Sequence, residues 1–296
     1  MRVAVLGLGR MGIPISARLE GAGHELSVWN RSPGPTQAYT DRGIRVLGRP
    51  SEAWEHADVC ITMLADGPAL EAVALGEDGL LAVEANEMLA SETSALIDMS
   101  TVGADTSARV AEECGRRGVS FLRAPVSGNP SVVAAGNLGI IVSGPRDAFD
   151  RLGNMLRDIG PNLFYVGAGE ESRIAKLALN VMIGGTAQLM AEALVLAEKY
   201  GIDRAAMLEV IGGTAVGSPF VKYKTNALVA DDYSSTFTAS LMYKDLALAL
   251  EAAQDVGAPL PVAAVTQQLV EACIATGMGD ADFTALLPRL RRDAGL

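Results

Sequence analysis

Short apolar runs alternate with segments of helical periodicity through the first half of the chain. Each run is short enough to form one buried strand, and the segments between the runs carry apolar residues at helical spacing. Strands that alternate with helices in this way are typical of a parallel sheet with crossover helices. We therefore predict an α/β domain over residues 1–167, with strands at residues 3–6, 25–29, 59–64, 96–99, 119–122, 139–143 and 163–166.

The second half of the chain shows helical patterns only. After residue 169 the strand-like runs stop, and helical periods cover residues 187–200, 205–211, 241–256 and 262–276. We expect an all-helical domain over residues 168–296, with the domain boundary near residues 166–170.

A nearly continuous apolar stretch over residues 177–197 has about the length needed to cross a bilayer of about 30 Å. Polar side chains at Asn180, Gln188 and Glu192 argue against a membrane span, because polar groups are costly in mid-membrane. The helical spacing of the apolar residues instead favours a helix buried on most sides at the centre of the second domain. The residues with this spacing are Leu179, Met182, Leu189, Ala193 and Leu196.

Composition and charge exclude several classes of function. The chain has 296 residues, 49% of them hydrophobic, and a formal net charge of −11, which opposes binding to nucleic acid or to a membrane surface. Two histidines, and three cysteines without a C-x-x-C pair, do not suggest a metal site or a disulfide framework, and we expect the cysteines to be buried thiols. The first residues lack the long apolar stretch of a signal peptide, so we expect a cytoplasmic protein.

A glycine-rich motif directly follows the first predicted strand and opens a helix. In this context the first glycine allows a tight turn, the second lets the backbone approach a pyrophosphate, and the third lets the helix pack on the strand. The helix N-terminus attracts the negative charge of the ligand. The motif therefore predicts a Rossmann domain that binds a dinucleotide through Gly7, Leu8, Gly9, Arg10, Met11 and Gly12.

The end of the second predicted strand should read the adenosine ribose of that dinucleotide. Asn30, Arg31 and Ser32 stand there, and none of them is a carboxylate that would accept hydrogen bonds from a free 2′-hydroxyl. Arg31 can instead pair with a 2′-phosphate. We predict NADP as the cofactor and regard NAD as possible but disfavoured. The alternative is that Arg31 is a solvated turn residue.

Several dehydrogenase chemistries lack their residues in this sequence. His24 and His56 fall in turns of the first domain and are poorly placed as a general acid. No tyrosine is followed four residues later by lysine, and no P-loop or G-x-S-x-G motif is present. The proton donor must therefore be a Lys, Tyr, Asp or Glu.

Five motifs in order give the chain an end-to-end resemblance to the β-hydroxyacid dehydrogenases, which include 3-hydroxyisobutyrate dehydrogenase and the NADPH-dependent glyoxylate/succinic semialdehyde reductases. The resemblance implies a two-domain architecture like that of 6-phosphogluconate dehydrogenase, a homodimer or homotetramer, and an active site between the domains. The motifs are residues 7–14, Asp98-Met99-Ser100-Thr101, Ala124-Pro125-Val126-Ser127-Gly128, Lys176 with Asn180, and Lys244-Asp245.

By this resemblance Lys176 is the catalytic acid/base. A lysine near the start of an apolar helix is partly desolvated, and with oxidised nicotinamide nearby we expect its pKa to fall toward the range that acid/base work requires. Asn180 lies one turn further along the same helix, where its amide would hold Lys176 or the substrate oxygen. A surface role for Lys176 and a structural hydrogen bond for Asn180 are the alternatives.

The resemblance also implies that Ser127 and Gly128 bind the substrate carboxylate. Here the sequence departs from the family pattern, because Arg123 replaces an Asp and Asn129-Pro130 follows Ser-Gly. Asn129 adds bulk and hydrogen-bonding capacity, so a larger or differently substituted substrate is compatible with this loop. Arg123 either contributes to selectivity or forms a structural ion pair.

Further residues belong to the site by the same resemblance. Thr101 and Leu64, each at the end of a predicted strand, would contact the cofactor, although Thr101 is equally suited to cap the next helix. Lys244 would also bind the cofactor, and Asp245 and Phe237 would contact the substrate. A buried ion pair without a catalytic role is the alternative for Lys244 and Asp245.

These features predict an NADP-dependent oxidoreductase that transfers a hydride between nicotinamide and a short β-hydroxy acid, or the corresponding aldehyde or keto acid. One alternative is an imine reductase on the same scaffold, although Lys176 stands where such relatives carry Asp or Tyr. The other is a non-catalytic dinucleotide-binding interaction protein.

Overall fold

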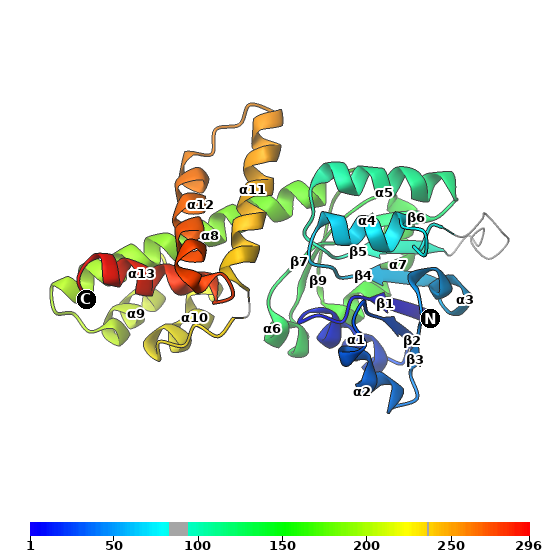
Figure 1. Ribbon diagram of the computed structural model, residues 1–296, viewed down its shortest axis with the longest axis horizontal. Coiled ribbons are helices and arrows are strands. Elements are labelled where there is room, and N and C mark those ends of the chain that lie inside the picture. Colours follow the sequence, from blue (N-terminus) through cyan, green and yellow to red (C-terminus); the bar gives the residue numbers. More distant parts are fainter. Residues whose placement is uncertain (83–93, 236) are drawn as a thin grey trace. The chain divides into compact units, whose positions relative to one another are not determined.

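The computed structural model describes residues 1–82, 94–235 and 237–296 (Figure 1). The chain divides into two compact units, Met1–Lys176 and Leu177–Leu296. The first unit contains a mixed sheet between helices, and the second contains helices around a core of their own. A Rossmann-type α/β unit followed by an all-helical unit is the predicted fold class.

The sheet of the first unit has nine strands in the order β3-β2-β1-β4-β5-β6-β8-β7, with β9 paired to β8. The predicted strands all form, and β3 and β7 are short additions of two residues each. The strands are β1 (Arg2–Leu6), β2 (Glu25–Trp29), β3 (Arg45–Val46), β4 (Val59–Thr62), β5 (Ala95–Asp98), β6 (Ser120–Arg123), β7 (Val126–Ser127), β8 (Gly139–Ser143) and β9 (Asn162–Gly167).

The prediction of a wholly parallel sheet is wrong at one place. Strand β8 runs antiparallel to β6 and to β7, whereas all the pairs among β1 to β6 are parallel. The connection from β6 to β8 contains only β7 and the five-residue helix α6 (Pro130–Ala134). Parallel neighbours need a full crossover, usually a longer helix, so this short connection returns the chain in the opposite direction.

Both faces of the sheet are buried, which explains the continuous apolar runs. In β1, Val3 and Val5 belong to the core on one face, and Ala4 and Leu6 belong to the core on the other. The first core receives side chains from α1 (Gly12–Gly21), α2 (Gln37–Thr40), α6 and α7 (Arg146–Ile159). The second receives them from α3 (Ala53–His56), α4 (Gly67–Leu75) and α5 (Ala104–Arg116).

The long helix α8 (Glu171–Lys199) begins in the first unit and continues into the second. Its first turn is tied to the sheet, because Ser172 bonds to Ser143 and Arg173 to Asp98. The division between the units therefore falls after Lys176, inside α8, whereas β9 ends at residue 167.

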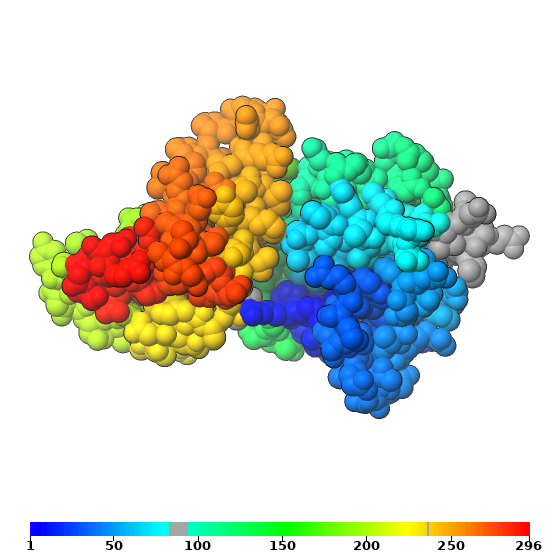
Figure 2. All heavy atoms as spheres, in the orientation of Figure 1, coloured from blue at the N-terminus to red at the C-terminus, as the bar shows by residue number. Residues whose placement is uncertain are grey.

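The second unit surrounds the rest of α8 with shorter helices. Residues predicted as helical correspond to α9 (Arg204–Gly213), α11 (Ala239–Asp255) and α12 (Pro261–Cys273), and α11 and α12 pack side by side (Figures 1 and 2). The prediction missed α10 (Pro219–Val229) and α13 (Leu286–Asp293). The start of α10 carries a capping signal, Ser218 followed by Pro219, and the Ser218 hydroxyl accepts a hydrogen bond from the amide of Val221.

The predicted buried stripe of α8 is wrong. Met182, Leu189 and Leu196 are 68%, 63% and 62% exposed, whereas Ala187 and Leu194 lie in the core of the second unit. Because α8 is apolar on nearly every side, its periodicity does not tell which face meets the other helices.

By length and composition alone, α8 is also apolar enough to cross a membrane. The core helix of a soluble protein meets the same criterion, and α8 packs Ala187, Met190 and Leu194 against α9, α11 and their neighbours in one cluster. We therefore interpret α8 as the central helix of a soluble domain.

The predicted buried thiols are confirmed. Cys60, Cys114 and Cys273 are free and buried. Burial raises the pKa of Cys114 to about 12, which keeps this thiol protonated and unreactive.

Truncation of Leu194 tests the corrected burial of α8. Leu194→Ala should lower the free energy of unfolding by about 2–5 kcal/mol, because it leaves a cavity in the core of the second unit. The matched control Val256→Ala, at a position 79% exposed, should change it by less than about 0.5 kcal/mol. Urea unfolding followed by circular dichroism measures both, and equal effects would contradict this assignment.

Candidate active site

The glycine-rich turn joins β1 to α1 with each glycine in a different steric role. Gly7 has φ 105°, and a Cβ there would lie 2.3 Å from the carbonyl oxygen of Met63. A Cβ on Gly12 would lie 1.8 Å from the carbonyl oxygen of Gly7, so only glycine lets α1 approach the strand. Gly9 has open space where its Cβ would be, as a pyrophosphate approaching the backbone requires.

A cavity of about 700 Å³ opens beside this turn, within the first unit. Its wall comes from the glycine turn, the end of β2 and the segment from the end of β4 into α4, and it includes Gly9, Trp29 and Leu64. The position is the carboxyl edge of the sheet, where the strand order changes direction between β1 and β4. Dinucleotides bind at this switch point in doubly wound sheets, so the residues present fit a nicotinamide dinucleotide.

Asn30 lies beside the cavity, but its side chain is occupied by the turn. Its Oδ1 accepts a hydrogen bond from the amide of Leu8 at 2.9 Å, and its Nδ2 donates to the carbonyl oxygen and hydroxyl of Ser32. The side chain of Leu8 is buried in the core, and Met11 packs against that core. Asn30 and Leu8 therefore shape the turn, and Gly9 and the exposed Arg10 are its outer residues.

Arg31 is exposed and lines the same cavity. Two carboxylates that the sequence analysis did not single out, Asp66 and Asp78, also line it. The Asp66 side chain caps α4 by accepting a hydrogen bond from the amide of Ala69, and Asp78 lies 3.5 Å from Arg49. The signal for Asp66 was present, because Asp followed by Gly67-Pro68 is a typical helix start.

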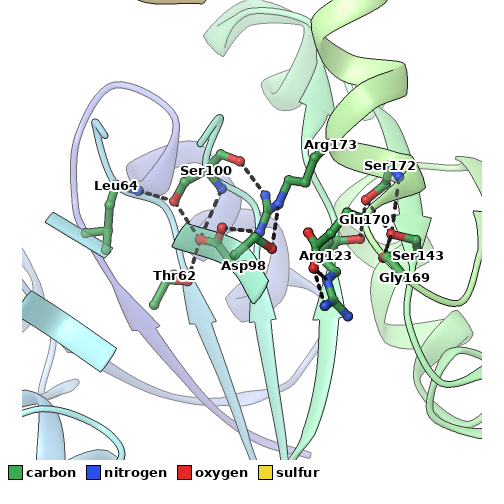
Figure 3. A network of polar contacts seen from close by, with 11 residues as sticks. Thr62, Leu64, Asp98, Ser100, Arg123, Ser143, Gly169, Glu170, Ser172 and Arg173 are labelled. Atoms are coloured by element: carbon green, nitrogen blue, oxygen red, sulfur yellow. Dashed lines mark hydrogen bonds and ion pairs between the residues drawn. The ribbon is translucent and has the colours of Figure 1, made fainter. Parts of the chain in front are cut away.

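A polar network fills the space between the strand ends and the first turn of α8 (Figure 3). The carboxylate of Asp98, at the end of β5, accepts hydrogen bonds from Thr62, Ser100 and Arg173. The Ser100 hydroxyl accepts a hydrogen bond from the amide of Leu64, on the cavity wall. Asp98 belongs to a motif recognised in the sequence, but its partner Arg173, which is buried although it is charged, was not predicted.

Arg123 forms the structural ion pair that was one of its two alternatives. Its Nε donates to Glu170 at 2.8 Å (Figure 3). Its guanidinium lies over the ring of Phe121. Arg123 is thus held by the residue that precedes α8.

The loop predicted to bind the substrate carboxylate follows β7. Gly128 has φ 147°, and a Cβ there would lie 2.9 Å from side-chain atoms of Leu138 and Val132. Asn129 caps α6, because its Oδ1 accepts hydrogen bonds from the amide of Val132 and the hydroxyl of Ser131. The departure Asn129-Pro130 is therefore a helix start, and Ser127 precedes it at the end of β7.

Lys176 is half-buried on α8, and Asn180 is buried one turn further along the helix. The Asn180 Nδ2 donates to the carboxylate of Asp245, and the other oxygen of that carboxylate lies 2.9 Å from the Lys244 Nζ. The structure thus brings Asn180, Lys244 and Asp245 together in the second unit. The amide of Asn180 is directed at Asp245, a partner that the sequence analysis did not anticipate.

The structure also describes the positions of Thr101, Phe237 and the two histidines. Thr101 lies two residues before Gly103, which is the N-cap residue of α5. Phe237 is half-buried and meets the ring of Phe283 edge-on at 5.8 Å in the core of the second unit. His24 pairs with Asp158, and His56 ends α3 where a turn was expected. Within the described ranges no cluster of His, Cys, Asp or Glu fits a metal ion.

Comparison with known proteins covers both units. The model of the NAD binding domain of 6-phosphogluconate dehydrogenase matches residues 2–167. The model of the NAD-binding domain of NADP-dependent 3-hydroxyisobutyrate dehydrogenase matches residues 167–290. These matches place a nicotinamide dinucleotide cofactor on the chain without distinguishing NADP from NAD.

Individual relatives agree with the family models. The oxidoreductase YfjR of Bacillus subtilis is 37% identical over 97% of this chain and 99% of its own. A 3-hydroxyisobutyrate dehydrogenase of Pseudomonas aeruginosa is 36% identical over 90% of each chain. The structure of Mycobacterium tuberculosis 3-hydroxyisobutyrate dehydrogenase with L-serine has a TM-score of 0.84 and 31% identity, over 98% of this chain and 99% of that one. The chain therefore belongs to the β-hydroxyacid dehydrogenase family of NAD(P)-dependent oxidoreductases.

Proposed function

We propose that this protein transfers a hydride between NADP and a short β-hydroxy acid, or the corresponding aldehyde or keto acid, with Lys176 as the acid/base. The observation that carries the proposal is the placement of Lys176. It is half-buried near the start of α8, one turn before Asn180, whose amide is fixed by the buried carboxylate of Asp245. A lysine held in such surroundings exchanges a proton with a substrate oxygen at a defined position.

Bound NADPH supplies the hydride that adds to the carbonyl carbon of the substrate. Lys176 Nζ then gives its proton to the carbonyl oxygen, so the C=O bond becomes a CH–OH group, and solvent returns a proton to the lysine. In the oxidative direction the amine takes the hydroxyl proton. The protonated lysine also stabilises the negative charge that develops on the oxygen.

The substrate carboxylate is assigned to the loop after β7. The Ser127 hydroxyl and the backbone N–H groups near Gly128 donate to it. Asn129 stiffens this loop, because its side chain caps α6 and Pro130 follows it. Phe237 and Asp245 complete the assigned substrate contacts. A small hydroxy acid agrees with the L-serine found with the Mycobacterium tuberculosis relative.

The preference for NADP over NAD is supported by the end of β2. Arg31 is exposed on the cavity wall, and residues 30–32 contain no carboxylate to accept hydrogen bonds from a free 2′-hydroxyl. The guanidinium therefore suits a 2′-phosphate. Lys244 and Thr101 are the other side chains that we assign to the cofactor.

The proposal includes a homodimer or homotetramer in the cytoplasm, without nucleic-acid or membrane partners. Three buried free thiols suit a reducing compartment, and the net charge of −11 opposes binding to polyanions. The exposed residues Met182, Leu189 and Leu196 form an apolar stripe on α8 that a second copy of the chain would cover.

Removal of the Lys176 amine tests the chemistry. Lys176→Ala should lower kcat/KM by about 10²–10⁴-fold, the usual contribution of one general acid, and change the Kd for NADPH by less than about threefold. The rate is followed as NADPH oxidation with glyoxylate, succinic semialdehyde, methylmalonate semialdehyde and a cyclic imine as substrates. Lys222→Ala, at an exposed lysine of α10, is the control. Wild-type turnover of the imine alone, or full activity of Lys176→Ala, would refute the proposal.

The cofactor preference depends on Arg31. Arg31→Ala should weaken NADPH binding about tenfold through loss of the phosphate contact, which corresponds to about 1.4 kcal/mol, and leave NADH binding unchanged. Titration of NADPH fluorescence measures both constants, with Arg151→Ala on the exposed face of α7 as the control. An equal loss for the two cofactors would show that Arg31 does not read the 2′-phosphate.

Self-association depends on the stripe on α8. Light scattering after size exclusion should give at least twice the chain mass of 30.8 kDa for the wild type, and Leu189→Glu should shift the protein toward that mass. A charge would have to be buried against the partner copy, which is costly. Val256→Glu, at an exposed position of the same unit, should leave the mass unchanged. A monomeric wild type would contradict the prediction.

A further inference from the structure

The contacts around Asp98 carry an inference about how Lys176 is held in place. Asp98 and Arg173 form an ion pair in which the carboxyl side chain is 0% exposed and the guanidinium side chain 1% exposed. Removing two charges from water is costly, and this cost is offset only when the geometry is good and the remaining donors and acceptors are satisfied.

Every polar group of this pair has a partner (Figure 3). Arg173 donates from Nη2 to Asp98 at 2.6 Å, from Nη1 to the carbonyl oxygen of Ser100 at 2.8 Å, and from Nε to the Ser107 hydroxyl at 3.2 Å. The other oxygen of Asp98 accepts from the hydroxyls of Thr62 and Ser100 at 2.7 and 2.6 Å. The planar guanidinium is thus held in one orientation by three acceptors, which lie at the end of β5, in the β5–α5 connection and in α5.

The network joins the helix that carries Lys176 to the wall of the cofactor cavity. Arg173 precedes Lys176 by one turn of α8, so fixing the guanidinium fixes the rotation and height of that turn. The same Asp98 carboxylate holds the Ser100 hydroxyl, and Ser100 accepts a hydrogen bond from the amide of Leu64, which lines the cavity. One buried carboxylate therefore sets both the start of α8 and one wall of the cavity.

The second ion pair at this end of α8 is less suited to that role. Arg123 binds Glu170, which lies before the helix begins, and the side chain of Glu170 is 22% exposed. The other carboxylate oxygen of Glu170 is buried without a hydrogen bond, whereas no atom of the Asp98–Arg173 network is unsatisfied among the residues that the structure describes. The Arg123–Glu170 pair therefore anchors the residue that precedes α8, whereas the Arg173–Asp98 pair anchors the first turn of the helix itself.

We propose that Arg173 and Asp98 are positioning residues, which set the reactive amine of Lys176 against the nicotinamide end of the bound cofactor. This inference rests on the proposed role of Lys176. Neither residue needs to touch the substrate or the cofactor, and both act through the segments that they hold. A displacement of about 1 Å at a reacting group costs on the order of 10²-fold in rate, so a loosened first turn should be visible in kcat.

The test separates the geometry of the guanidinium from its charge. Arg173→Lys keeps a positive charge beside Asp98 but replaces three directed donors with one compact ammonium group. We expect Arg173→Lys to fold, to lower kcat by about 10- to 100-fold, and to change KM and the Kd for NADPH by less than about threefold. Asp98→Asn should lower kcat as well and also weaken NADPH binding, because Asp98 holds Ser100 and, through it, the Leu64 segment of the cavity wall.

A comparison in the absence of Lys176 shows whether Arg173 acts through that lysine. Arg173→Lys should change the residual rate of Lys176→Ala by less than about twofold, because there is no amine left to misplace. The residual rate is measured as NADPH oxidation at high enzyme concentration, with the aldehyde acid that the wild type turns over fastest. An equal loss with and without Lys176 would overturn the positioning role in favour of general disruption.

A partly buried ion pair far from Lys176 provides the matched control. Arg204 pairs with Glu198, with side chains 11% and 12% exposed, about 33 Å along α8 from Lys176 at 1.5 Å per residue. Arg204→Lys should lower the melting temperature without lowering kcat of the folded enzyme. If Arg173→Lys fails to fold, Ser107→Ala removes one of its contacts and should lower kcat about threefold, with KM unchanged.

The outcomes distinguish this inference from the proposed function. Full activity of Lys176→Ala would refute the acid/base role and the positioning role together. Loss of activity in Lys176→Ala, with wild-type kcat in Arg173→Lys, would refute only the positioning role. Loss in both, with no further loss in the double variant, would support both.

Discussion

The burial of one carboxylate constrains the active-site side of the first unit. Asp98 lies at the end of β5, out of contact with water, and its charge is balanced by Arg173 from α8 and by hydroxyls from β4 and the β5–α5 connection. Elements distant in sequence must therefore meet at one point with fixed geometry, because a buried ion that loses a partner costs several kcal/mol. The start of α8 is thus attached to the sheet by a buried ion pair.

The cofactor cavity depends on a second constraint, the absence of side chains in the turn after β1. Gly7 and Gly12 are required by close contacts with Met63 and with each other, and Gly9 leaves its backbone open. Asn30 then locks the turn to the end of β2 through the amide of Leu8. Gly7 and Gly12 therefore build the turn, whereas Gly9 is open to a ligand. Arg31 also lines the cavity that a ligand can reach.

In the second unit a buried carboxylate again joins side chains from different helices. Asp245 joins Asn180 and Lys244 in one group: Asn180 donates a hydrogen bond to its carboxylate, and Lys244 forms an ion pair with it. The rest of α8 carries large apolar residues on both its buried and its exposed faces. A helix with this composition satisfies a core on one side and leaves a stripe on the other, which explains why its spacing misidentified the buried face.

The sequence by itself determined the fold class, the strands of the sheet, the glycine turn and the family, because these follow from local periodicity and from residues whose steric role is set by their neighbours along the chain. It did not reveal that β8 runs antiparallel or which face of α8 is buried. It also did not reveal that Arg123 pairs with Glu170, that Asn129 caps α6, or that Asn180 donates to Asp245. Nor did it show that Arg173 closes on Asp98. Only the tertiary structure decided these points, since the partner of a buried polar group is whichever group the folded chain brings within hydrogen-bonding distance, however far apart the two lie in sequence.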